Sequence, residues 1–542
     1  MKLRIGLITV CLITILLLIS ACGSSSSPPA SSSISSPSGG QISSTGTPVS
    51  QSKYGGTLIW IRKTGIPSLG APTDVPTQTG TFMSVSPVLE TLVLCDDQER
   101  IVPWLAEKVD TSPDGKQITF TLRQGIKFHD GTDFNAQAVK YNLEGVLAAN
   151  CSGSAVLKNV DSYEIINDYV LRLNLKKYDA RLLLQLAQSG IGMIASPTAL
   201  QKPTTPDNMA KDHLVGTGPF KFDSWAKDQY IRFVRWDGYW QKGKPYLDAI
   251  EQRNSANVTA SIMSFKAGEV NMVEDIDPSD YVQLKQEGYA VGIPTTLAFV
   301  FSISPDSANP DSPFANQKVR EALEYAIDKK GMTEGLGKGT QNPAYQLAAP
   351  KDPWYIQGLP LREYNPAKAK QLLAEAGYPD GFKCILQSDV RIRDDSLVAL
   401  QTYFKAVGID GTIDKADVAR ATTFGQNGWK GVLIPGFPNW SSFSSWTSRF
   451  VNTAIPYPSI AYPGGLSAYQ EAWNQVCSEP DYDKRISKMK ELLKQLYDQA
   501  LIIPYYWDAP RYVTDGTVMD MAWDTRNTNG YYDAANVWLK KK

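Results

Sequence analysis

IVPWLAEKVDTSPDGKQITFTLRQGIKFHDG, at residues 101–131, is the part of the sequence that says most about its architecture. Over residues 118–122 apolar side chains alternate with threonines, which is typical of a half-buried strand. Pro113-Asp114-Gly115 before this run and Asp130-Gly131 after it are turn sequences. The stretch therefore predicts short strands separated by tight turns.

The same pattern extends outward in the first half of the chain. Leu171, Leu173 and Leu175 alternate with polar residues and predict another strand. A further strand is expected over residues 54–60, after a pair of glycines.

The second half changes to the period of a helix. Apolar residues spaced along residues 319–327 predict one buried helix face. Asn365-Pro366 is typical of a helix start and Gly377 of a helix end, so residues 366–376 are expected to form a second helix. A third helix is predicted over residues 486–500, followed by a strand at residues 501–506.

Composition limits the function. The chain has 542 residues, enough for three or four domain-sized units at about 150 residues each. It carries 54 Lys and Arg against 55 Asp and Glu, and this balance argues against nucleic acid as a partner. The two histidines, His129 and His213, lie far apart in sequence, which argues against a histidine-rich metal centre.

The N-terminus has the pattern of an export signal. Lys2 and Arg4 precede an uncharged stretch, Ile5 to Ile19, that is short for a membrane-spanning helix. Ser20-Ala21-Cys22 resembles a bacterial lipobox, which predicts a signal peptide at residues 1–21 and lipid on Cys22. An ordinary signal peptide with an incidental cysteine is the alternative. The serine-rich residues 22–53 are predicted to form a disordered tether.

Four cysteines remain after this segment: Cys95, Cys151, Cys384 and Cys477. An even number in an exported chain permits disulfides. A pairing of Cys95 with Cys151 and of Cys384 with Cys477 is preferred, and four free, buried thiols are the alternative.

Motifs of known catalytic chemistry are missing from the sequence. There is no G-x-S-x-G nucleophile motif, and the glycine-rich residues 335–339 lack the spacing of a phosphate loop. His129 is expected to pack within its turn. A pair of catalytic carboxylates stays open, because 55 acids offer too many pairs. We therefore expect a protein that is not an enzyme and needs no cofactor or metal.

Several segments together resemble the bacterial solute-binding proteins of family 5, which are extracellular receptors of peptide and nickel ABC importers. The similarity covers residues 54–506 and is strongest over residues 101–139. The other matching segments are Gly216–Phe220, Lys244–Asp248, Lys266–Glu269, Val319–Asp328 and Lys370–Gly377.

The resemblance implies an α/β fold in the form of a two-lobed clamshell, the periplasmic-binding-protein-like type II architecture. An extra strand-rich subdomain is inserted in lobe one. The implied bounds are residues 54–85, 219–298 and 505–542 for lobe one, 86–218 for the inserted subdomain and 299–504 for lobe two. Hinges are expected near residues 297–304 and 503–507.

The resemblance also implies a function. The chain is expected to be a monomeric, extracytoplasmic lipoprotein that captures a peptide-like or other small neutral solute between its lobes. It would present this solute to an ABC permease and its ATPase. The alternatives are an oligosaccharide-binding receptor of the same fold, an exported glycan-active enzyme, and a sensing or adhesion protein without a permease.

The solute site is expected in lobe two. In peptide-binding members an acidic residue in this region pairs with the α-amino group of the ligand, yet no Asp or Glu lies between Lys430 and Glu471. Aromatic and neutral polar residues fill this stretch and favour a neutral solute. The predicted ligand-binding residues are Trp429, Phe437, Asn439, Trp440 and Trp446. The alternative is that these aromatic residues fill a core or an interface.

Overall fold

The fold is described from a computed structural model. The described residues are 53–63, 65–66, 68–75, 84–294, 299–435, 439–440, 457–521 and 532–541. The predicted signal peptide, Cys22, nearly all of the predicted tether, Phe437 and Trp446 lie outside them.

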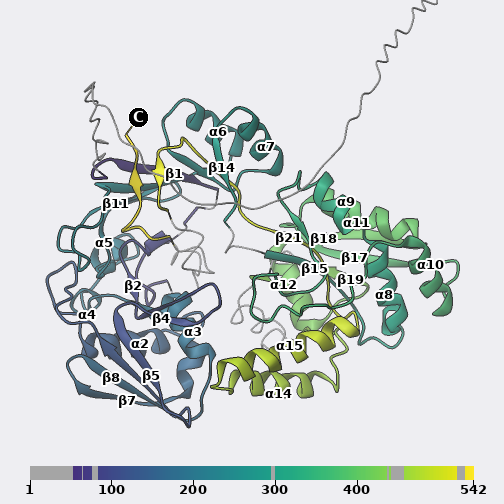
Figure 1. Ribbon diagram of the computed structural model, residues 1–542, viewed down its shortest axis with the longest axis horizontal. Helices are drawn as coiled ribbons and strands as arrows, with labels where there is room; N and C mark the ends of the chain where they lie inside the picture. Colours follow the sequence, from purple (N-terminus) through teal and green to yellow (C-terminus); the bar gives the residue numbers. More distant parts are fainter. Residues whose placement is uncertain are drawn as a thin grey trace, which may run out of the picture. The chain divides into compact units, whose positions relative to one another are not determined.

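A seven-stranded mixed sheet contains strands from distant parts of the chain (Figure 1). Its strand β1 pairs in parallel with both neighbours, β12 and β13, and the other pairs are antiparallel. Helices α6 (Val258–Lys266) and α7 (Pro278–Gln286) pack against it through an apolar cluster that includes Phe265 and Leu284. In spatial order the strands are β10 (Phe220–Ala226), β11 (Tyr230–Arg235), β12 (Ala249–Asn254), β1 (Thr57–Arg62), β13 (Met272–Glu274), β22 (Tyr512–Thr514) and β14 (Ala290–Gly292).

A second sheet gathers strands from the later part of the chain. Strand β17 lies parallel to both β18 and β19, and β15 is antiparallel to β19 and β21. Helices α8 (Gln317–Ala326), α10 (Pro366–Glu375) and α11 (Asp394–Ala406) share one apolar core with it. The strands are β16 (Asn342–Pro343), β21 (Ile503–Asp508), β15 (Phe299–Pro305), β19 (Val432–Ile434), β17 (Phe382–Asp389) and β18 (Ile409–Ala416), with β20 (Asn439–Trp440) beside β15.

In the sequence, the strands of a four-stranded antiparallel sheet lie between β1 and β10 of the first sheet. It has the order β5 (Ala106–Thr111), β6 (Gln117–Leu122), β8 (Val170–Leu175) and β7 (Val160–Asn167). The side chains of Ile118, Phe120 and Leu122 are fully buried against α2 (Ala136–Ala148) and α3 (Arg181–Gln188). The strands predicted from alternation at residues 118–122 and 171–175 are confirmed.

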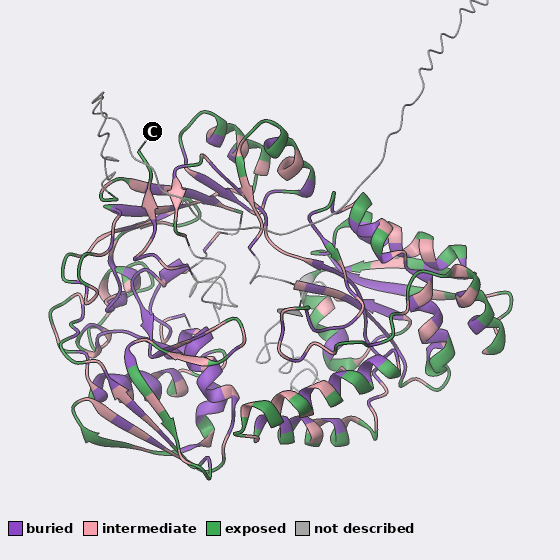
Figure 2. Cartoon of the chain, viewed as in Figure 1, coloured by how far each residue is buried: buried purple, intermediate pink, exposed green. Residues whose placement is uncertain are grey.

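The predicted helices are also present. Asn365 accepts a hydrogen bond from the Lys368 backbone N–H and begins α10, and Gly377 follows the helix with a φ of 93°. Helix α15 (Tyr482–Asp498) leads into β21, as the periodicity predicts. Figure 2 shows buried and exposed residues alternating along α14 (Leu466–Cys477) and α15.

Shorter elements complete the described part of the chain. They are β2 (Glu90–Thr91), β3 (Val93–Cys95), β4 (Ile101–Pro103), β9 (Met193–Ile194), β23 (Val518–Met519), β24 (Trp538–Leu539), α4 (Pro197–Leu200), α5 (Met209–His213), α9 (Lys329–Gly335), α12 (Val418–Asn427), and the 3₁₀ turns η1 (Ser154–Asn159), η2 (Gly190–Gly192) and η3 (Pro313–Ala315). Within the described residues, no helix is both long enough and apolar enough to cross a membrane.

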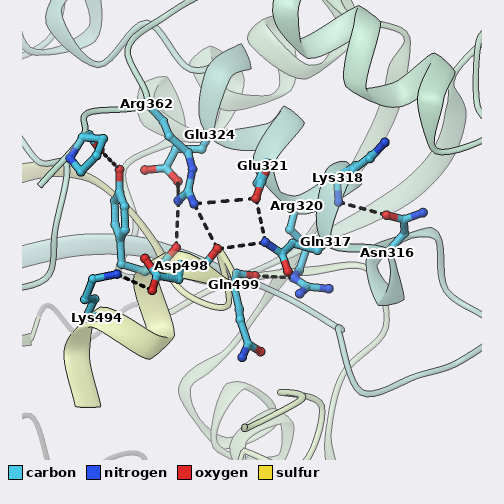
Figure 3. Close-up of polar contacts among 12 residues, drawn as sticks. Asn316, Gln317, Lys318, Arg320, Glu321, Glu324, Arg362, Lys494, Asp498 and Gln499 are labelled. Carbon is cyan, nitrogen blue, oxygen red and sulfur yellow. Dashed lines mark hydrogen bonds and ion pairs between the residues drawn. The ribbon is translucent and has the colours of Figure 1, made fainter. Parts of the chain in front are cut away.

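Two arginines hold the end of α15 in place (Figure 3). Arg362 donates to the carbonyl oxygens of Tyr497 and Asp498 at 2.8 and 3.1 Å, and Arg320 donates to that of Gln499 at 2.9 Å. The last carbonyls of a helix have no partner within the helix, and cations are favoured there. These contacts fix the point from which the chain enters β21.

The cysteines do not follow the preferred pairing. Cys95, Cys151, Cys384 and Cys477 are all free thiols. Cys384 packs against the core of the second sheet, whereas Cys477 belongs to a different apolar cluster. Cys151 donates to the Pro72 carbonyl oxygen, and the Cys95 sulfur accepts from a glutamine. Three of the thiols are buried and Cys384 is half-buried, so the alternative of free thiols describes the structure better.

Candidate functional site

The chain passes between the two large sheets twice. The first passage runs from β14 to β15, and the second runs from β21 to β22. The chain therefore moves from one sheet to the other between residues 292 and 299 and again between residues 508 and 512. We call the polar residues around these passages the crossover site; they are Arg62, Glu274, Asp275, Thr340, Gln341, Asp508 and Arg511.

Arg511 joins both sheets at the second passage. Its Nε donates to the Ile276 carbonyl oxygen at 3.0 Å, just beyond β13. Its Nη1 donates to the Thr340 hydroxyl at 3.2 Å and to Asp508 at 2.6 Å. Ile276 follows β13 of the first sheet and Thr340 precedes β16 of the second. This buried guanidinium therefore contacts residues next to both sheets. The planar fork of arginine suits it to hold several acceptors in fixed directions.

Asp508 is held from two sides. One carboxylate oxygen accepts from Arg511, and the other accepts from Gln341 Nε2 at 2.9 Å. The buried pair is therefore supported by further hydrogen bonds, which a desolvated ion pair requires.

The crossover site has a second ion pair, between neighbouring strands β1 and β13 of the first sheet. Arg62 donates to Glu274 at 3.1 Å through Nε and to the Ser84 hydroxyl at 2.8 Å through Nη1. Burial raises the pKa of Glu274 to about 7, although the Arg62 charge opposes the shift. Burial also raises the pKa of the adjacent Asp275, whose backbone has a φ of 60°. The carboxyl groups are therefore poised to take up protons more readily than free acids.

A further buried carboxylate, Glu90, lies near the start of the segment predicted as the inserted subdomain. Glu90 Oε1 accepts from Trp104 Nε1 at 3.0 Å and from the Tyr239 hydroxyl at 2.9 Å. Its Oε2 accepts from Trp240 Nε1 at 3.0 Å and from the Thr217 hydroxyl at 2.8 Å. Burial raises the pKa of Glu90 to about 7, and the four donors act in the opposite direction. Glu90 thus ties together segments far apart in the sequence.

His129 has the packing role expected from its turn. Gly216 N–H donates to Nδ1 at 3.3 Å, so the proton resides on Nε2, which donates to the Gly218 carbonyl oxygen at 2.9 Å. Desolvation lowers the pKa of His129 to about 4, so the ring is neutral. The imidazole closes the bend at residues 216–219 and makes no contact with a nucleophile in the described residues.

The predicted ligand-binding residues do not come together as a described group. Trp429 is buried, and its indole N–H donates to the Ser304 carbonyl oxygen at 2.9 Å. This placement favours a packing role for Trp429. Asn439 and Trp440 form β20, whose backbone pairs with Val300 and Phe299 of β15. Phe437 and Trp446 lie outside the described residues, and ligand binding by the set stays a prediction.

The hinges predicted near residues 297–304 and 503–507 lie next to the two passages, but sequence reasoning singled out neither the polar residues of the crossover site nor Glu90. A signal for Glu90 was available in the sequence, because its donors Trp104 and Thr217 both lie in segments that carry the family resemblance. Arg511 has no such signal, because its contacts with Thr340 and Ile276 join residues 171 and 235 positions apart.

Comparison with known proteins identifies the family of the chain and several relatives. The model of bacterial extracellular solute-binding proteins, family 5 middle, matches residues 100–455. Glutathione-binding protein GsiB of Salmonella typhi is 34% identical over 302 residues, which is 54% of this chain and 56% of that protein. GsiB of Escherichia coli O157:H7 is 34% identical over 298 residues with the same coverage. The chain thus spans about half the length of the curated relatives it matches.

Solved structures share the fold at lower identity. NikA from Brucella suis, in complex with Fe(III)-EDTA, has a TM-score of 0.77 at 22% identity, covering 90% of this chain and 100% of that chain. DppA from Helicobacter pylori, in complex with the peptide STSA, has a TM-score of 0.70 at 22% identity, covering 90% and 99%. The predicted α/β, two-lobed type II fold is confirmed by this similarity.

Proposed function

Because the chain belongs to the bacterial extracellular solute-binding proteins of family 5, we propose that it is the lipid-anchored binding component of an ABC importer. It captures a peptide-like or other small neutral solute between its lobes and presents the solute to the permease. The protein itself performs no bond chemistry.

The crossover site is the observation that carries this proposal. A receptor that closes around a solute needs two bodies, a small number of chain connections between them, and polar groups that hold those connections. The two passages and the contacts of Arg511 with Ile276 and Thr340 meet these needs. We keep the lobe and subdomain bounds stated above as part of the proposal.

Two relatives support a peptide-like solute. GsiB is a glutathione-binding protein, and the DppA structure contains a peptide. The stretch between Lys430 and Glu471 has no acid for a free α-amino group, so a solute without an exposed charge in this region fits better. The neutral aromatic and polar residues there also suit an oligosaccharide, which is the second candidate.

Thermal-shift measurements on the full mature protein distinguish the candidates. The panel contains glutathione, a free-amine tripeptide, the same tripeptide acetylated at its N-terminus, and maltotriose. A solute at 100 times its Kd stabilises the folded protein by about 2.7 kcal/mol. We expect the acetylated tripeptide to stabilise at least as strongly as the free-amine form. A strong shift with the free-amine peptide alone would exclude the neutral-solute proposal, and steady turnover of any compound would exclude a pure receptor.

The anchor is proposed from the N-terminal sequence, and one contact fits it. Lys53 Nζ lies 3.3 Å from Asp520 and over the ring of Trp538 at 5.0 Å. These contacts attach the end of the predicted tether beside β23 and β24. Mass spectrometry of the mature protein is expected to find diacylglycerol on Cys22. An unmodified cysteine or a different N-terminus would contradict the lipoprotein proposal.

A further inference from the structure

We propose that a pocket formed by residues of lobe one and of the inserted subdomain, beside the crossover site, receives a small aliphatic side chain of the bound solute. This inference rests on the proposed function and names part of the chemistry that the solute carries. The side-chain pocket, as we call it, is defined by residues from the segments 86–94, 104, 219–239 and 532–535. The lining residues used below are Leu89, Glu90, Leu94, Trp104, Tyr239 and Tyr532.

The walls of the side-chain pocket are mainly apolar. Leu89, Tyr239 and Tyr532 are buried, whereas Leu94 and Trp104 are half-buried and leave the pocket partly open. A pocket with aliphatic and aromatic walls favours an apolar occupant, because the apolar surfaces of both the pocket and the occupant are then removed from water.

The charge of Glu90 does not alter this preference. Both carboxylate oxygens are already occupied by four donors at 2.8 to 3.0 Å. The other acid of the lining, Asp533, accepts from Asn536 Nδ2 at 2.5 Å. An ammonium or carboxylate group entering the pocket would lose its hydration without a matching partner from Glu90, which is costly. The pocket therefore selects for an uncharged group.

The size of the pocket selects among uncharged groups. Its cavity volume is about 70 Å³. One buried water needs about 10 to 15 Å³ by this kind of measure, so about five non-hydrogen atoms fit. A leucine or valine side chain meets this limit, whereas an indole exceeds it.

The pocket adjoins the crossover site through the chain and through packing. Ser86 lines the pocket, and Ser84, two residues earlier, accepts the hydrogen bond from Arg62. Tyr532 lines the pocket and packs edge-on against Trp60 at 5.0 Å, two residues before Arg62 on β1. These contacts place the pocket close to Arg62, and under the proposal a solute bound beside Arg62 extends one side chain into the pocket.

The test compares two tripeptides on the full mature protein by calorimetry. Ala-Leu-Ala and Ala-Gly-Ala, both acetylated and amidated, differ only in the central side chain. We expect the leucine peptide to bind about tenfold more tightly, since burying an aliphatic side chain contributes that much or more. Leu94→Trp places a larger ring at the half-buried wall and is expected to reduce this preference below about threefold. Leu361→Trp makes the same change at an exposed position and is the matched control.

A second variant tests the size of the pocket in the opposite direction. Leu94→Ala enlarges it and is expected to move the preference from the leucine peptide to its phenylalanine counterpart. Circular dichroism at the temperature of the titrations confirms that each variant is folded. Binding of both peptides with equal affinity, or a preference that Leu94→Trp and Leu94→Ala leave unchanged, would overturn the pocket alone. If neither peptide binds and maltotriose does, the peptide proposal fails and the pocket inference fails with it.

Discussion

The hydroxyl of Tyr482 donates a hydrogen bond of 2.6 Å to the carbonyl oxygen of Gln98. Tyr482 begins α15, and Gln98 lies in the turn between β3 and β4. The tyrosine ring also lies 5.4 Å from the Arg100 guanidinium. A backbone bond of 2.8 Å from Ala180 to Cys477 makes a second contact between the same two parts of the chain. The strand-rich segment before residue 218 thus touches helices α14 and α15 at two points.

Tyr482→Phe removes this hydroxyl and is expected to weaken solute binding. The contact joins two segments of the protein and involves no solute atom. A hydrogen bond of this kind contributes about 1 kcal/mol. If the contact forms on closure, affinity falls about fivefold. Calorimetry with the tightest solute of the panel measures the change, and small-angle scattering is expected to detect a more open solute-free protein. Tyr230→Phe in β11 is the control, and identical affinity and scattering for both variants would contradict the prediction.

Arg511→Ala is expected to lower the free energy of unfolding by about 3 kcal/mol. The change leaves the half-buried Asp508 with only Gln341 as a side-chain donor, and breaking a largely desolvated pair from one side is costly. Urea denaturation measures the loss. Asp508→Asn combined with Arg511→Ala is expected to recover part of it, because no unpaired charge remains. A double variant as unstable as the sum of the two single variants would contradict coupling between them.

Glu90→Ala is expected to lower the free energy of unfolding by about 3 kcal/mol or more. Four donors, from Trp104, Thr217, Tyr239 and Trp240, lose their common acceptor, and each buried donor left without a partner is unfavourable. Glu107→Ala, at an exposed position of β5, is the matched control and is expected to have little effect. A similar stability for both variants would show that the carboxylate is not the centre of this packing.

How far the sequence predicted the fold depends on how local the deciding interactions are. The ends of α10 follow from Asn365 and Gly377, which act on their immediate neighbours, so they were predicted. The parallel pairing of β1 with β12 and β13 joins residues about 190 and 212 positions apart, and no spacing in the sequence specifies that register. The resemblance to family 5 supplied the fold class where local reasoning did not. The crossover site stayed hidden because its contacts exist only after both sheets form.

The two histidines are expected to have opposite effects on the pH dependence of stability. The pKa of His129 is lowered to about 4 in the fold, so the unfolded chain binds more protons between about pH 4 and 6.5. The stability that neutral His129 provides is therefore lost as the pH falls through this range. The pKa of His213 is raised, because Asp74 at 2.9 Å and the Lys202 carbonyl at 3.0 Å accept from its ring and outweigh its desolvation. Its contribution is present below about pH 6.5 and is lost as the pH rises through its folded pKa.

Urea denaturation from pH 4.5 to 8 checks both signs. His129→Gln should reduce the loss of stability on acidification by about 2 kcal/mol, and His213→Gln should reduce the loss on alkalinisation. Each variant is the control for the other, since both remove one imidazole. Differences from the wild type that have the same sign at both sites would contradict the assigned protonation states.

Trp429 and Trp440 give the last prediction, because substitutions at these two positions separate packing from solute binding. Trp429→Phe keeps most of the buried ring but loses the hydrogen bond to the Ser304 carbonyl. It is expected to lower the free energy of unfolding by about 1 to 3 kcal/mol and to leave affinity unchanged. Trp440→Ala is expected to weaken binding of the neutral tripeptide by at least tenfold, since an aromatic face contacting a solute contributes on that scale. Calorimetry gives the affinities and urea denaturation the stabilities. If Trp440→Ala binds as tightly as the wild type, the aromatic stretch is packing material throughout, and the solute contacts must come from the crossover site and the side-chain pocket.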